Sequence, residues 1–170
     1  MQPDVYANNW SFAYDRLFEP MTEEQAREIH RLKKPASGYA AIFGGSTAPK
    51  EMVRVTFGPT SRFYETTWFD TRRRKVLEYQ FKVIDERLFL LVIMEFEYDG
   101  EAKRAIRTAH FNFDPEGKVG VVKVDRKTDI RESKVVPHDV RNNWEAVPEF
   151  GDYDRLLIKD RGPPEPALNS

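Results

Sequence analysis

Three histidines, His30, His110 and His138, are the side chains of this 170-residue chain best suited to acid–base or metal chemistry near neutral pH. They lack the H-x-H and H-E-x-x-H spacings that place two imidazoles on one face of a strand or helix. A catalytic or metal site would have to assemble in space, and His110, Asp114 and His138 are the set that would form it. We expect ordinary hydrogen bonds for these residues, and we predict no metal ion and no other cofactor.

Charged side chains gather at two further places. Glu95 and Glu97 lie two positions apart, and with Asp99 and Glu101 they form an acidic run. Paired carboxylates perform acid–base chemistry when their environments differ, whereas these stand at the end of a strand, where we expect all of them to be solvated. The basic cluster at 72–75 is confined to one loop of a chain with a net charge of −1. We therefore expect a solvated turn and no nucleic-acid partner.

A glycine-rich segment is the first candidate for partner binding, and its residues are Gly44, Gly45, Ser46 and Thr47. It lacks the glycine spacings of phosphate-binding loops, and no helical pattern follows it. Two interpretations remain open. The segment is either a flexible loop between strands or a protruding loop that enters the cleft of a partner.

The second candidate for partner binding mixes aromatic and acidic side chains near the C-terminus, and its residues are Trp144, Glu149, Phe150, Asp152 and Tyr153. Aromatic side chains anchor protein interfaces, and carboxylates steer association with a basic partner. The alternative is structural: the same aromatics would pack back onto the sheet as a C-terminal strap. Both interpretations stay open at this point.

Composition limits the class of protein. A chain of this size, with 40% hydrophobic and 32% charged residues, forms one globular domain, here 1–170. Aromatic residues make up 13% and favour a sheet-based core. The absence of cysteine excludes disulfides and thiolate nucleophiles. The N-terminus does not resemble a signal peptide, and the longest apolar run, at 88–94, is too short to span a membrane. We expect a cytoplasmic protein that does not bind membranes.

Two helices are expected in the N-terminal segment 10–34. Apolar side chains at 10, 13, 14, 17 and 18 follow the period of one helix face. Thr22 and Gln25 have the spacing of a capping box, which predicts the start of a second helix, and Pro35 ends it.

From residue 39 to residue 136 the apolar period changes to two, which predicts seven or eight short antiparallel strands. In the most apolar strand, six alternating side chains are expected to lie on one face: Leu88, Leu90, Val92, Met94, Phe96 and Tyr98. The predicted fold is α+β, with the two helices packed on a curved β-meander that forms a half-barrel or barrel. Residues 137–160, the C-terminal strap, follow the sheet, and 161–170 are expected to form a flexible tail.

Two stretches of the chain, 111–119 and 143–153, resemble segments of small actinobacterial-type proteins, some of which look like immunity proteins of polymorphic toxin systems. The first stretch runs Phe-Asn-Phe-Asp-Pro-Glu-Gly-Lys-Val, and the second runs from Asn143 to Tyr153. The resemblance implies a non-catalytic, protein-binding inhibitor that neutralises a cognate toxin by occluding its active site. It assigns no role to any individual residue.

Two other functions remain open. A curled meander rich in Phe and Tyr could enclose an apolar cavity, as a lipocalin-like carrier of a small apolar ligand does. The third possibility is a small cone- or barrel-type enzyme that uses His110, Asp114 or His138.

Overall fold

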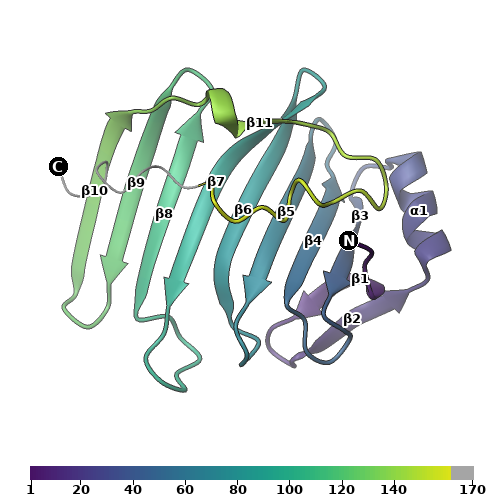
Figure 1. Cartoon of the computed structure of the whole chain (residues 1–170), viewed down its shortest axis with the longest axis horizontal. Helices are drawn as coiled ribbons and strands as arrows, with labels where there is room; N and C mark the ends of the chain where they lie inside the picture. Colours follow the sequence, from purple (N-terminus) through teal and green to yellow (C-terminus); the bar gives the residue numbers. More distant parts are fainter. Residues whose placement is uncertain (162–170) are drawn as a thin grey trace.

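The computed structural model describes residues 1–161, which form one large antiparallel sheet, one α-helix and one short 3-10 helix (Figure 1). The helices are α1 (Glu23–Leu32) and η1 (Arg141–Asn143). The strands are β1 (Val5–Ser11), β2 (Arg16–Met21), β3 (Ser37–Phe43), β4 (Glu51–Phe57), β5 (Arg62–Phe69), β6 (Lys75–Ile84), β7 (Arg87–Glu97), β8 (Arg107–Asp114), β9 (Lys118–Asp125), β10 (Ile130–Pro137) and β11 (Trp144–Ala146).

The sheet is an open meander. From β3 to β10 each strand pairs with the next, and β1 lies between β3 and β2 at the other end. The short strand β11 pairs with the beginning of β7. The two outermost strands, β10 and β2, lie at opposite ends of the molecule (Figure 1). The prediction of a seven- to eight-stranded half-barrel or barrel is therefore wrong: the sheet has eleven strands and does not close in the part that the structure describes.

The prediction of a first N-terminal helix is also wrong, because residues 10–18 belong to the β1–β2 hairpin. Trp10 pairs with Leu17 across the hairpin, and Asp15 takes a left-handed conformation (φ 50°) in its turn. The hairpin runs behind β3 and β4 (Figure 1), and its Trp10 and Phe12 rings lie 6.4 and 5.7 Å from the ring of Phe69 on β5. These long-range aromatic contacts stabilise a hairpin that the local helical period does not indicate.

The second predicted helix is present as α1. The Thr22 hydroxyl accepts a hydrogen bond from the Gln25 amide (3.1 Å), and the Gln25 side chain accepts one from the Thr22 amide (2.8 Å). This capping box satisfies two backbone donors that the first turn of a helix leaves free. Lys33 ends the helix in the left-handed region (φ 49°). Ala26 and His30 are its buried residues, and they face the aromatic side chains of the sheet.

The sheet has two differently covered faces. We call the face under α1 and the C-terminal strap the strap face, and the face crossed by the β1–β2 hairpin the hairpin face. The larger core lies on the strap face and consists mostly of aromatic side chains that are at most 1% exposed: Tyr39, Phe43, Phe57, Tyr64, Trp68, Tyr79 and Phe81. A smaller core on the hairpin face joins Ala7, Trp10, Ala40, Ile42 and Met52.

A β-bulge in β7 overturns the prediction that its even-numbered residues share one face. Gln80 pairs with Val92 while its neighbour Phe81 pairs with Leu90, so Leu91 is an extra residue without a partner on β6. A one-residue insertion moves every later side chain to the opposite face. Leu88 and Leu90 therefore share the strap face with Ile93 and Glu95, whereas Val92, Met94 and Phe96 lie on the hairpin face.

Candidate functional site

The strap aromatics, predicted as either interface anchors or packing residues, pack onto the sheet. Tyr153 is fully buried, and its hydroxyl lies 2.8 Å from the hydroxyl of Tyr39, which in turn lies 2.8 Å from Nδ1 of His30. This chain of hydrogen bonds joins the strap, β3 and α1. Burial lowers the pKa of His30, and the nearby charge of Lys33 adds to the effect. A neutral imidazole is therefore favoured at the end of this chain.

The remaining strap candidates divide between packing and solvent. Phe150 stacks on Tyr6 with ring centres 5.4 Å apart, and the Trp144 ring lies 4.8 Å from Phe89. Glu149 and Asp152 are exposed. Of the five candidates in the strap, two carboxylates are thus left at the surface for a partner.

A largely buried ion-pair cluster fixes the strap where it leaves β11, and no pattern in the sequence indicates this cluster. Glu145 receives hydrogen bonds from Arg155 (3.0 Å) and from Arg161 (2.7 Å). Glu145 and Arg161 have side chains only 9% and 8% exposed, whereas the Arg155 side chain is 72% exposed. Residues 162–170, which make up the rest of the predicted flexible tail, lie outside the described residues.

The glycine-rich segment is a loop between β3 and β4 whose two glycine amides are already hydrogen-bonded. The amides of Gly44 and Gly45 donate to one carboxylate oxygen of Asp4, at 2.6 and 3.1 Å. Both glycines have positive φ angles, 90° and 100°, a conformation that suits glycine. Ser46 and Thr47 are exposed. The loop is tied to the N-terminal segment, and Asp4 takes the place that a bound anion would need.

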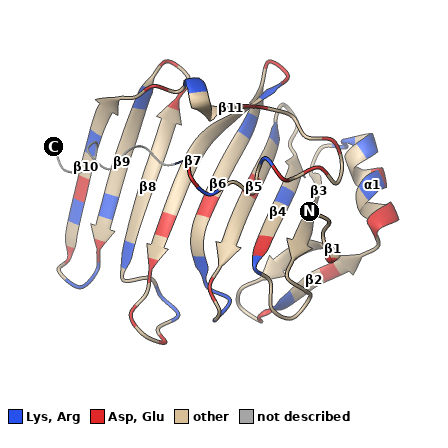
Figure 2. Ribbon diagram, viewed as in Figure 1, with Lys and Arg blue, Asp and Glu red and all other residues tan. Residues whose placement is uncertain are grey.

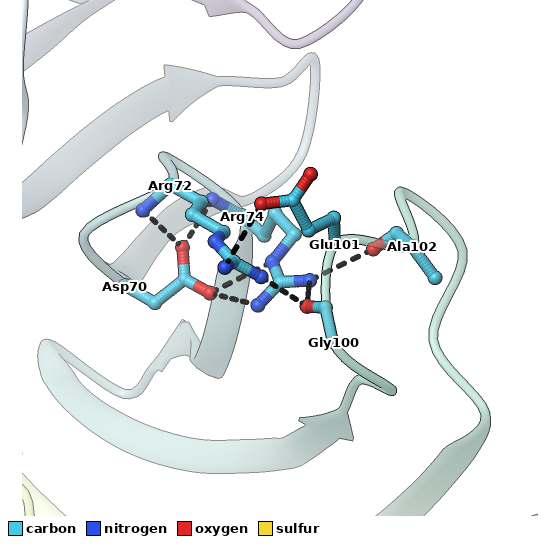
Figure 3. A network of polar contacts seen from close by, with 6 residues as sticks. All are labelled: Asp70, Arg72, Arg74, Gly100, Glu101 and Ala102. Carbon is cyan, nitrogen blue, oxygen red and sulfur yellow. Dashed lines mark hydrogen bonds and ion pairs between the residues drawn. The ribbon is translucent and has the colours of Figure 1, made fainter.

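The basic cluster at 72–75 is neutralised by carboxylates. Arg72 pairs with Glu101 (3.3 Å), Arg73 with Asp15 (3.6 Å), Arg74 with Asp70 (2.7 Å) and Lys75 with Glu78. Figure 3 shows Arg72 and Arg74 between the β5–β6 loop and the carbonyl groups of the β7–β8 loop. Because each basic side chain has a carboxylate partner, this cluster joins loops and offers little charge to a polyanion.

The third predicted set, His110, Asp114 and His138, does not come together. The side chains of His110 and Asp114 both lie on the hairpin face of β8. The His138 ring lies 5.2 Å from Phe113, a core residue of the strap face. Among residues 1–161 no group of three His, Asp or Glu side chains is placed to hold a metal ion.

A hollow of about 490 Å³ on the strap face, over β7 to β10, is the site that the sequence did not indicate. Its floor is Ala109 on β8, which pairs with Glu95 on β7 and with Lys123 on β9. Lys123 pairs in turn with Glu132 on β10. The small Ala109 side chain therefore leaves an open space between longer charged neighbours on three other strands.

The next row of residues across these strands closes one side of the hollow. Arg107 lies between Glu97 and Asp125 and donates to both, at 3.0 and 2.7 Å. Ile130 continues the row on β10 and is 51% exposed. The hydrogen bond from Arg107 holds the pKa of the Asp125 carboxyl below its usual range. Figure 2 shows charges of both signs along β7 to β10.

Glu95 is an exposed, unmatched charge in the hollow. It makes no hydrogen bond to another residue of 1–161, and Lys123 lies two strand spacings away, roughly 9.5 Å between backbones. Desolvation by the neighbouring strands raises the pKa of Glu95, and the charge of Lys123 opposes that rise. In all, four carboxylates and two basic side chains line the hollow: Glu95, Glu97, Asp125, Glu132, Arg107 and Lys123.

This arrangement suits recognition of a cation better than catalysis. A catalytic site would need a nucleophile, a base or a metal within reach of one another, and the hollow holds carboxylates that are either bound to Arg107 or isolated. No helix within residues 1–161 combines the length and apolarity that crossing a membrane requires. Comparison with known proteins finds no family model, no curated protein and no solved structure that matches this chain.

Proposed function

We propose that the protein is a non-catalytic, protein-binding inhibitor of the immunity-protein kind, and that it binds its partner with the hollow over Ala109. The observation that carries the proposal is a 490 Å³ hollow with a surplus of carboxylates, among them an exposed Glu95 that has no hydrogen-bond partner in residues 1–161. An exposed carboxylate without an ion-pair partner is accessible to a cationic side chain, which can form a charge-assisted hydrogen bond with it. The same hollow gives a catalytic reaction no set of cooperating groups.

The partner group that fits is a lysine or arginine side chain at the tip of a loop. Such a side chain would lie on Ala109 and bind Glu95, while Glu132 and the exposed Ile130 form the rim. An acidic hollow also steers a basic surface toward it, which raises the rate of association. A toxin domain with basic residues around its active site would meet these requirements, and a bound inhibitor would occlude it.

The aromatic side chains that first suggested a lipocalin-like carrier have another role. Tyr39, Tyr64, Trp68 and Tyr79 are at most 1% exposed, and with Tyr153 of the strap they belong to one packed core. A carrier needs such side chains to line an open cavity. This packing favours the inhibitor over the carrier.

The test compares two charge reversals of equal size. Glu95→Lys places a cation in the hollow, and Glu116→Lys, the control, makes the same change at an exposed turn between β8 and β9. The tagged proteins are used to capture partners from the source cells, and the retained protein is then purified and its affinity and activity measured. We expect the wild type and Glu116→Lys to bind one partner with 1:1 stoichiometry and to inhibit it, and Glu95→Lys to bind at least about tenfold more weakly.

Two outcomes would contradict the proposal. Equal affinity of the two variants would exclude the hollow as the binding site. A captured partner whose activity is unchanged by the bound protein would exclude inhibition. Ala109→Trp, which fills the hollow without changing charge, is a second variant, and circular dichroism checks that it is folded.

A further inference from the structure

Strand β10 is an open edge of the sheet. All eight of its residues pair with β9 in one unbroken register, from Ile130 with Asp125 to Pro137 with Lys118. No strand of residues 1–161 pairs with its other side. An edge of this length presents a row of unpaired backbone donors and acceptors, which is a template for another strand.

The hydrogen-bond pattern fixes which residues face outward. The His138 amide donates to the Gly117 carbonyl (2.9 Å), so this pair is a hydrogen-bonded one. Bonded and non-bonded pairs alternate along antiparallel strands. Val136 and Lys134 therefore direct their backbone groups to β9, whereas Val135, Ser133 and Arg131 direct theirs outward. Pro137, which has no N–H to donate, also falls on the outward side at the end of the strand.

We propose that β10 pairs with β10 of a second copy of this chain, antiparallel and about a twofold axis at Ser133. In this register Ser133 faces Ser133 of the second copy, and Arg131 faces Val135 of the second copy. Each of these residues has its backbone groups directed outward, so the pairs make the hydrogen bonds that the alternation requires. The two sheets become one continuous sheet.

The charges of the edge residues favour this register over the two neighbouring registers. With the axis at Ser133, Glu132 lies opposite Lys134 of the second copy, and the twofold axis repeats this pair. They occupy a non-hydrogen-bonded position, where side chains approach most closely. The two nearest registers that keep the same backbone pattern place Glu132 opposite Glu132, or Lys134 opposite Lys134. The sequence of the edge is thus complementary to itself in one register.

Apolar contacts support the same register. Ile130 lies opposite Val136 of the second copy on the strap face, and the exposed Val135 (71%) lies beside the stem of Arg131 on the hairpin face. Charged edge strands also occur as protection against pairing. In that case the wild type would stay monomeric, which the first test below measures.

The first test measures the mass in solution by sedimentation equilibrium over a range of protein concentrations. We expect a concentration-dependent dimer for the wild type. Glu132→Lys and Lys134→Glu each place two pairs of like charges at the interface, and we expect each to shift the protein to monomer. The double variant Glu132→Lys with Lys134→Glu restores both pairs with their signs exchanged, and we expect it to dimerise again.

The second test uses the absence of cysteine in the chain. Ser133→Cys places two thiols across the axis with Cα atoms about 5.5 Å apart, within the range that a disulfide spans. We expect it to form a covalent dimer on oxidation. Arg131→Cys, the matched control on the same edge, should not, because Arg131 faces Val135 and not itself.

A monomeric wild type at all concentrations would overturn the proposal. A dimer that is unaffected by the single charge reversals, or a covalent dimer formed equally well by Arg131→Cys, would overturn this register. The hollow over Ala109 and the β10 edge are tested by different measurements, partner affinity for Glu95→Lys and the mass of the purified protein for the β10 variants, so failure of one proposal does not imply failure of the other.

Discussion

The hydroxyl groups of Tyr39 and Tyr153, 114 positions apart in the sequence, lie 2.8 Å from each other in the buried core. Their hydrogen bond joins β3 to the C-terminal strap, and Tyr39 extends the connection to His30 of α1. The strap is therefore held to the sheet by a specific polar contact as well as by aromatic packing.

Replacing Tyr153 by Phe removes this hydrogen bond but keeps the packed ring. We expect a loss of about 1 kcal/mol in the free energy of unfolding, since Tyr39 keeps its bond to His30 and is not left without a partner. Chemical denaturation measures the change. Tyr14→Phe is the matched control, because Tyr14 is 73% exposed, and it should change stability by less than about 0.5 kcal/mol. Equal effects at the two positions would mean that the buried hydrogen bond contributes nothing.

The two arginines that bind Glu145 should contribute unequally. Glu145→Gln leaves the Arg161 guanidinium buried without a compensating charge, which typically costs about 3–5 kcal/mol. Arg155 is 72% exposed at its side chain, so Arg155→Gln removes a screened pair and should cost about 1 kcal/mol or less. Urea denaturation of the two variants checks this. A larger loss in the Arg155 variant would show that the exposed arginine is the one that stabilises the strap.

Acid should weaken the fold through His30. Its pKa is lowered in the folded protein by burial and by Lys33, whereas an unfolded histidine has a pKa near 6.5. Below about pH 6.5 the unfolded chain therefore takes up a proton that the folded protein resists, and stability falls as the pH decreases. Asp70 and Asp139, whose pKa values are also lowered, contribute their own losses only when the unfolded carboxyls titrate, near pH 4.

The measurement is the urea midpoint between about pH 8 and about pH 5, a window set by the histidine pKa. His30→Gln should be less stable at high pH and less sensitive to pH. His110→Gln, on the hairpin face, is the control and should keep the wild-type dependence. If His30→Gln loses stability with acid as steeply as the wild type does, another group is responsible.

The parts of the fold that depend on residues close together in the sequence were predictable. The capping box of Thr22 and Gln25 defines the start of α1 within four positions, and the alternation of Val53, Val55 and Phe57 indicates β4. The first helix was not predictable in the same way. Its apolar period also fits a hairpin, and the contacts that favour the hairpin come from Phe69, more than fifty positions later.

The bulge at Leu91 and the hollow over Ala109 depend on pairing between strands. A strict alternation through β7 predicted one apolar face, and the single extra residue changes which side chains face the strap. Glu95, Ala109 and Lys123 become neighbours only because β7, β8 and β9 align in one register. A sequence gives each residue type but not that register, so the acidic run was visible and the hollow was not.

The position of the strap in the chain has a consequence during synthesis. The ribosome completes β3 to β10 before it reaches Tyr153, so a growing chain can form the sheet while the strap that covers it is still missing. Tyr39, Tyr64 and Trp68, which are fully buried in the finished protein, then face water. At about 5–20 residues per second this interval lasts on the order of seconds. During that time a chaperone, or a second nascent chain, has access to the aromatic surface.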